Sequence, residues 1–163
     1  MCENTNSNNS SLQADLPHDQ QADEFGPMIY SYSRAQAIED GVLVDLMASD
    51  ETLRLVREAG FRLPIAMTSA AFHETITVGT KVEGGNTVYP ASQSLAGRLW
   101  DVLMVLHFSI RAATRNGNAD IVHFKVDVDP RGNGKHKTVS LYCQIGPGDE
   151  GEPVLTISLE GED

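Results

Sequence analysis

Residues 94–116 read SLAGRLWDVLMVLHFSIRAATRN, and this stretch decides the fold. Its apolar side chains recur at intervals of three and four residues, the spacing that places them on one face of an α-helix. The apolar face consists of Leu95, Leu99, Val102, Leu103, Leu106, Ile110 and Ala113. A helix with one long apolar face is expected to lie against the hydrophobic core of its domain.

The same helix carries a second row of large side chains on another side. This row, here called the Trp100 row, consists of Trp100, Met104, His107 and Arg111 at spacings of four, three and four. Trp and Arg are enriched at the centres of protein interfaces, which favours a binding surface. Aromatic rows at helical spacing are more often part of a core, and helices upstream also need a surface to pack on. Both interpretations stay open.

The segment after this helix changes to a period of two, which is typical of half-buried β-strands. Apolar and polar side chains alternate in three runs, whose apolar members are Val122, Phe124, Val126 and Val128, then Val139, Leu141, Cys143 and Ile145, then Leu155, Ile157 and Leu159. Three such strands joined by short links form an antiparallel meander with one dry face. The long helix is expected to cover that face.

The segment before the long helix predicts three shorter helices, over residues 34–39, 50–59 and 68–76, each with an N-cap residue. Residues 42–46 are apolar and β-branched and predict a short edge strand. The glycine-rich residues 79–90 predict a loop with little regular structure. The fold class is therefore α+β: a C-terminal three-stranded antiparallel meander packed against a long central helix, with about three shorter helices from the N-terminal half.

A single globular domain is expected over residues 28–163. Residues 1–26 are polar, with few apolar groups, and predict a disordered leader because they cannot offset the entropy of ordering a backbone. Cys2 lies in this leader and Cys143 in a strand, so no disulfide is predicted. No apolar run has the length of a membrane helix, and the leader lacks the regions of a signal peptide. These features predict a cytoplasmic protein without a membrane partner.

The net charge of −11 comes from the two ends of the chain. Residues 1–26 hold five acids and residues 147–163 hold six, with no Lys or Arg in either segment. The 120 residues between them carry twelve acids and twelve bases. A neutral body lacks the basic footprint that binds phosphate, so direct nucleic-acid binding is not expected.

The chain shows no pattern typical of a catalytic, metal or cofactor site. Its histidines, His18, His73, His107, His123 and His136, include no pair at the i,i+4 spacing of helical zinc sites. Cys143 alternates inward with its apolar neighbours and is expected to be buried and inert. We therefore predict no catalytic residue, no metal and no cofactor.

Two polar clusters remain, and both have simple structural interpretations. Arg34 lies close in sequence to Glu39 and Asp40, and these residues are expected to serve in capping and surface pairing. Arg98 and Asp101 lie three residues apart on the flank of the long helix and are expected to form a solvated ion pair of small energetic worth.

Three segments together resemble a known family: residues 30–45, YSYSRAQAIEDGVLVD; residues 97–103, GRLWDVL; and residues 146–163, GPGDEGEPVLTISLEGED. With AGFRLPIA at residues 59–66, the resemblance covers residues 28–163. The family is an uncharacterised domain of unknown function in small proteins, often carried on plasmids, phages and other mobile elements. The resemblance supplies no catalytic residues. It implies a role in host takeover or in blocking host defence.

The first functional hypothesis is a non-enzymatic protein-binding accessory of a mobile element, acting on a host or element-encoded protein such as a defence or nuclease complex. Its contact surface would combine the Trp100 row, residues 79–90 and the acidic C-terminal end. The alternative is a small enzyme or ligand-binding domain, with a pocket between the central helix and the sheet that uses His107, Arg34 and Asp101. A third hypothesis, DNA mimicry, requires acids of the body to gather on one face, among them Asp45, Asp50, Glu51 and Glu58.

Overall fold

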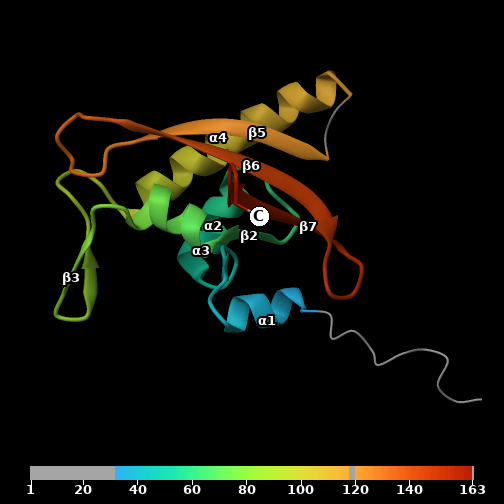
Figure 1. Ribbon diagram of the computed structural model, residues 1–163, viewed down its shortest axis with the longest axis horizontal. Helices are drawn as coiled ribbons and strands as arrows, with labels where there is room; N and C mark the ends of the chain where they lie inside the picture. Colours follow the sequence, from blue (N-terminus) through green and yellow to red (C-terminus); the bar gives the residue numbers. More distant parts are fainter. Residues whose placement is uncertain (1–31, 118–119, 163) are drawn as a thin grey trace, which may run out of the picture. The chain divides into compact units, whose positions relative to one another are not determined.

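The computed structural model describes residues 32–117 and 120–162, so the predicted leader at residues 1–26 lies outside the described residues. The fold is mixed α+β, as predicted, with one five-stranded sheet and one two-stranded hairpin (Figure 1). The elements are α1 Arg34–Glu39, β1 Leu43–Asp45, α2 Asp50–Glu58, β2 Ile65–Thr68, α3 Ser69–Phe72, the π-helix η1 His73–Thr77, β3 Lys81–Glu83, β4 Asn86–Val88, α4 Leu95–Arg115, β5 Ile121–Val128, β6 Lys137–Pro147 and β7 Pro153–Leu159.

The predicted meander forms the C-terminal part of the sheet. Strand β6 pairs antiparallel with both β5 and β7, and α4 runs alongside β5 (Figure 1). The predicted edge strand at residues 42–46 is present as β1, which forms the far edge of the sheet. Strand β2 was not predicted; it joins β7 in parallel, and the strand order is β1-β2-β7-β6-β5. Strand β2 shows no alternation because Ile65, Ala66 and Met67 are all fully buried. A central strand covered on both faces gives no period-two signal.

Helix α4 is the main apolar support of the sheet, as its stripe predicts. Ser94 caps the helix and accepts a hydrogen bond from the backbone N–H of Gly97 at 3.1 Å. The central members of the stripe have no exposed surface: Leu99, Val102, Leu103 and Leu106. They lie in one hydrophobic cluster with side chains of β5, β6 and β7. Burial of each leucine stabilises the fold by roughly 1.5–3 kcal/mol before entropy is counted.

Helix α1 is fixed to the connection between β6 and β7. Asp149 in that connection accepts hydrogen bonds from the backbone N–H groups of Arg34 at 2.6 Å and Ala35 at 2.8 Å. The Arg34 guanidinium donates to Thr156 Oγ1 at 2.9 Å and to the Leu155 carbonyl at 3.2 Å. The expected surface pairing of Arg34 with Glu39 and Asp40 is therefore wrong, because Arg34 turns toward β7. Two segments far apart in sequence meet at this contact.

The region before α4 differs from the prediction in two places. The third helix begins as α3 but continues as the π-helix η1. Residues 79–90, expected to lack regular structure, contain the exposed β3–β4 hairpin, which projects from the domain (Figure 1). Glycines at the hairpin turn, with φ of 58° for Gly84 and 81° for Gly85, permit this geometry.

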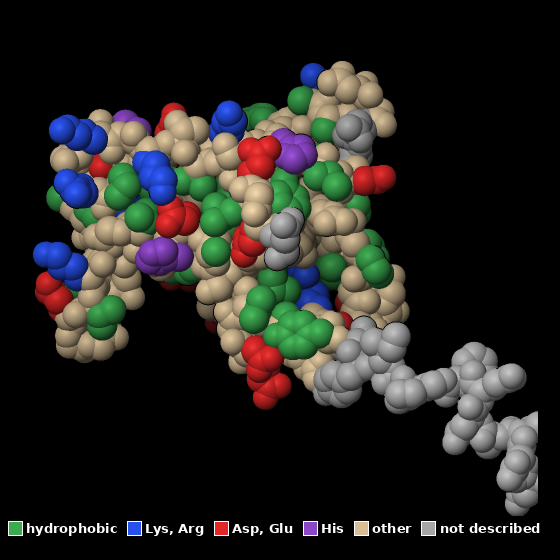
Figure 2. Space-filling view, in the orientation of Figure 1, with side chains coloured by type: hydrophobic (Ala, Val, Ile, Leu, Met, Phe, Trp, Pro, Cys, Tyr) green, Lys and Arg blue, Asp and Glu red, His purple; other side chains and the backbone are tan. Residues whose placement is uncertain are grey.

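The surface carries charges of both signs. Acidic and basic side chains both occur on the face seen in Figure 2. Among the described residues, no helix has the length and apolar character needed to cross a bilayer.

Candidate functional site

The Trp100 row divides into a packed part and an open part. Trp100 and Met104 are half-buried and pack against the hydrophobic cluster, as the core interpretation predicts for them. His107 is also half-buried, whereas Arg111 is exposed. The last two side chains line a groove at the C-terminal half of α4.

The apolar groove lies between α4, the sheet and the connection from α2 to β2. It encloses about 360 Å³ and is lined by Gly60, Phe61, Arg62, Leu63, His107, Ile110, Arg111, Val122, Cys143, Ile145 and Leu155. Most of these side chains are hydrophobic, and no Asp or Glu is among them. The volume lies within the range of pockets that hold small ligands or partner side chains.

One wall of the groove depends on a tight turn after α2. Gly60 has φ of +94°, and a Cβ atom there would lie 3.3 Å from His107 Cε1. The next residue, Phe61, presents its ring perpendicular to the His107 imidazole, with centroids 6.2 Å apart. The Arg57 guanidinium holds the turn by donating to the carbonyls of Phe61 at 3.4 Å and Arg62 at 2.8 Å. These contacts hold the wall of the groove in place.

The floor and the mouth of the groove differ in chemistry. Cys143 lies in the floor with 2% exposure, and burial raises its thiol pKa to about 12. The prediction that this cysteine is buried is confirmed, and its thiol is unreactive at neutral pH. Ile145 at the mouth remains 39% exposed, and Arg62 and Arg111 are exposed beside it. The groove thus has a dry floor and a cationic mouth.

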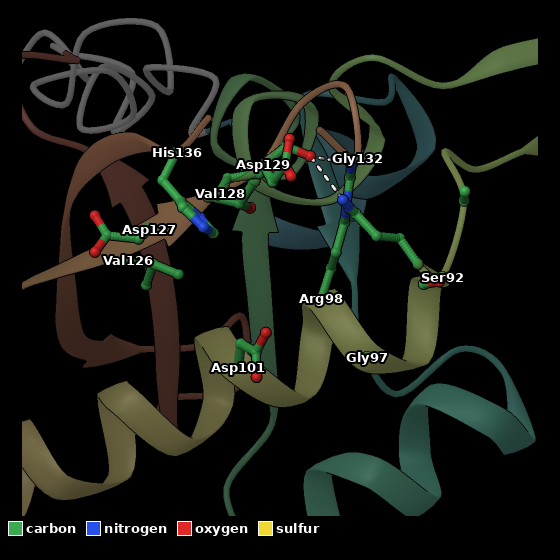
Figure 3. A pocket seen from close by; sticks show the side chains of 13 residues that line it. Ser92, Gly97, Arg98, Asp101, Val126, Asp127, Val128, Asp129, Gly132 and His136 are labelled. Carbon is green, nitrogen blue, oxygen red and sulfur yellow. Dashed lines mark hydrogen bonds between the residues drawn. The ribbon is translucent and has the colours of Figure 1, made fainter. Parts of the chain in front are cut away.

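A second pocket, the polar pocket, lies beside the N-terminal half of α4 and encloses about 430 Å³ (Figure 3). Arg98 and Asp101 point into it from α4, and His136 approaches from the connection between β5 and β6 (Figure 3). Asp127 also lines the pocket and accepts a hydrogen bond from the Thr138 hydroxyl at 2.6 Å. Ser92 on its rim has φ of 65°, which makes it the only non-glycine residue with positive φ in the described chain.

Arg98 is the structural centre of the polar pocket and is only 7% exposed. Its Nη1 donates to the carbonyls of Ile76 and Val78, both at 2.7 Å, and its Nη2 donates to the Asp129 carbonyl at 3.2 Å. Its Nε donates to Gln93 Oε1 at 2.6 Å. Burial lowers the pKa of Arg98, but a guanidinium remains charged in proteins.

These bonds overturn the expected solvated ion pair between Arg98 and Asp101. Arg98 instead ties the end of η1 to the end of β5, because it bonds the carbonyls of both segments. Burial raises the pKa of Asp101, which no described cation offsets by an ion pair. Asp101 is partly exposed to solvent at the polar pocket and forms no ion pair with another described residue.

The structure does not bring together the three residues of the predicted ligand pocket. His107 lines the apolar groove and Asp101 lines the polar pocket, while Arg34 lines neither and bonds to β7. Within residues 32–117 and 120–162, no group of three or more His, Cys, Asp and Glu is placed to hold a metal ion.

Sequence reasoning found one side of the groove and missed the other. The Trp100 row pointed to His107 and Arg111. Ile145 was expected only on the dry face of the sheet, and no pattern marked Arg62 or Leu63 as part of a binding site. The glycine at position 60 marks the turn but does not show which helix face it meets. The role of Arg98 depends on distant carbonyls, which no local pattern encodes.

The fold is a mixed α+β domain, and the apolar groove and the polar pocket are two separate candidate binding sites on it. The chain belongs to a family of unknown function, DUF6573, whose model matches residues 22–163. No curated protein and no solved structure matches the chain.

Proposed function

We propose that the protein is a non-enzymatic binding module that holds a partner protein in the apolar groove. The observation that carries this proposal is the groove itself, with hydrophobic walls, an exposed Ile145 at its mouth and no lining carboxylate. Burial of an apolar partner side chain there would remove hydrophobic surface from water on both sides. The unreactive thiol of Cys143 is consistent with a site that binds without covalent chemistry.

The surroundings of the groove also suit a protein interface. Phe108 follows His107 on α4 and is 59% exposed, with the two rings 5.5 Å apart and nearly perpendicular. An aromatic ring beside an arginine-lined groove has the composition of an interface hot spot. Trp100, Met104 and the β3–β4 hairpin are not needed for this contact.

The resemblance to proteins of mobile elements suggests the kind of partner. A host defence or nuclease complex is the partner class that we propose, with the protein acting as an accessory that blocks or redirects it. This part of the proposal rests on the resemblance, whereas the position of the site rests on the groove.

The test compares two isoleucines at the same end of the sheet. Ile145 is 39% exposed and lines the groove, while Ile121 on the adjacent strand is 43% exposed and does not line it. Affinity capture from host lysate with wild type, Ile145→Asp and Ile121→Asp should recover a partner with wild type and Ile121→Asp only. Recovery of the same proteins by Ile145→Asp, with its fold intact by circular dichroism, would remove the groove from the proposal.

The second candidate is a ligand-binding or enzymatic role for the polar pocket. It is favoured by the raised pKa of Asp101, which lines the pocket without an ion pair to another described residue, and by the positive φ of Ser92, since strained residues gather at functional sites. The two carboxylates of Asp101 and Asp127 favour a small organic cation. Spermidine, added during NMR spectroscopy, should shift the His136 resonances in wild type and not in Asp101→Asn. Absence of any shift in wild type would set this candidate aside.

A further inference from the structure

We infer that the partner segment held in the apolar groove carries Asp or Glu beside its apolar side chains, and that Arg62 and Arg111 bind these carboxylates. This inference rests on the proposed function and names the chemistry of the partner. The inference depends on the positions of the charged side chains around the groove, in addition to its apolar walls.

Two guanidinium groups lie at the mouth of the groove. Arg62 follows the tight turn after α2, and Arg111 lies near the end of α4, so they approach the groove from different elements. Both are exposed, and neither forms an ion pair with another described residue. Their charges are therefore available to a bound molecule.

Nearby arginines on α2 are used differently. Arg54 pairs with Glu58 at 3.7 Å, and Arg57 donates to the carbonyls of the turn that forms the groove wall. The charge of Arg54 is thus matched within the helix, and the donors of Arg57 serve the fold. Arg62 and Arg111 have neither role in the described structure.

The chemistry of the groove selects for an acidic segment with apolar side chains. A guanidinium presents paired N–H donors that match the two oxygens of a carboxylate. The apolar floor around Cys143 and Val122 excludes water and strengthens charge interactions at its edge. A lysine in the same position of the partner would be repelled by both arginines.

Nucleic acid fits this site less well than an acidic protein segment. A nucleic-acid backbone presents phosphates to arginines, but it carries no branched aliphatic side chain to fill a hydrophobic groove. The groove has seven apolar lining side chains and two cations, so its composition matches a segment in which leucine-like residues are flanked by acids.

The test uses three synthetic peptides that share a Leu-Leu centre and differ in the two flanking residues. They are acetyl-Asp-Leu-Leu-Asp-amide, its Asn-Leu-Leu-Asn counterpart and its Lys-Leu-Leu-Lys counterpart, each titrated into the full chain and followed by the NMR amide shifts of Leu63 and Ile145. The acidic peptide should bind about tenfold more tightly than the Asn peptide at low salt, since each exposed ion pair contributes roughly threefold. The Lys peptide should bind most weakly, and salt should reduce the differences.

Matched variants separate charge recognition from the groove itself. The double variant Arg62→Gln, Arg111→Gln should bind the acidic and Asn peptides equally, whereas Arg54→Gln should keep the wild-type preference. Equal binding of these two peptides by wild type would overturn the inference about acids and leave the proposed groove in place. Failure of all three peptides to shift Leu63 and Ile145 would overturn both the inference and the groove as a binding site for protein segments.

Discussion

The two flanks of α4 use the same residue type for opposite purposes. Arg98, on the polar flank, is buried and donates its hydrogen bonds to backbone carbonyls of η1 and β5. Arg111, thirteen residues later on the other flank, is exposed and lines the apolar groove. The first arginine holds segments of the fold together, and the second leaves its donors in solvent.

This difference follows from what each flank packs against. At the polar flank, irregular segments converge and leave carbonyls without partners in a helix or sheet, so a buried guanidinium satisfies them. At the apolar flank, the sheet and the α2–β2 turn present hydrophobic side chains that need no polar partner. Whether an arginine on this helix is buried and hydrogen-bonded or exposed therefore depends on the backbone that it faces.

Substitution of each arginine in turn should give the largest difference between the two flanks. Arg98→Ala should lower the free energy of unfolding by about 3–5 kcal/mol, because it leaves buried carbonyls without donors. Arg111→Ala should change it by less than about 0.5 kcal/mol, as is usual for an exposed side chain. Urea denaturation followed by circular dichroism measures both values. Similar losses for the two variants would show that burial does not separate their roles.

The alkylation rate of Cys143 reports how well the apolar groove excludes water. With its thiol pKa raised to about 12, Cys143 should react with iodoacetamide at pH 8 roughly two to three orders of magnitude more slowly than an exposed cysteine. A Cys2→Ser variant leaves Cys143 as the single thiol, and mass spectrometry follows its alkylation. Addition of urea should restore the normal rate. Rapid alkylation of the folded protein would show that water and reagent reach the floor of the groove.

The fold was largely predictable because its main elements have strong periodic patterns. The stripe that includes Leu99 and Leu106 predicted α4, and the alternation around Val126 and Leu141 predicted the meander. Strand β2 was missed because burial on both faces removes alternation. The π-helix was missed because its apolar spacing resembles that of an ordinary helix over so few residues.

The candidate sites were less predictable because they depend on contacts between distant segments. The Trp100 row indicated that α4 contacts two surfaces. Trp100 and Met104 pack against the hydrophobic cluster, which agrees with the core interpretation of the row. The sequence pattern of α4 does not show that residues 60–63 form a groove with His107. The position of Arg34 against β7 depends on Asp149, more than a hundred residues away, which no local pattern could reveal.

Alanine substitutions at two glycines with positive φ test the wall of the groove, and their expected effect is smaller. Gly41 has φ of +72° with open space around its Cβ position, so Gly41→Ala should cost about 1 kcal/mol from backbone strain alone. Gly60→Ala carries a similar strain and also places a methyl group 3.3 Å from the His107 ring. We expect it to cost about 1 kcal/mol more than the control. If Gly60→Ala and Gly41→Ala lose the same free energy of unfolding in urea denaturation, the His107 ring moves aside without cost.

The smallest expected effect concerns Asp101 on the polar flank. Because burial raises its pKa in the folded protein, the charged carboxylate opposes folding at neutral pH, and this opposition fades as pH falls through the raised pKa. Asp101→Asn should therefore be more stable than wild type at pH 7, by roughly a few tenths of a kcal/mol since the side chain stays partly in water. Below about pH 4, near the ordinary pKa of an aspartate, the stabilities of the two proteins should converge.

The control Asp127→Asn weakens the hydrogen bond from the Thr138 hydroxyl and should bring no gain in stability. Urea denaturation at both pH values measures the difference, and a stability gain for Asp101→Asn that persists at low pH would mean that the amide acts by contact and not by removing charge.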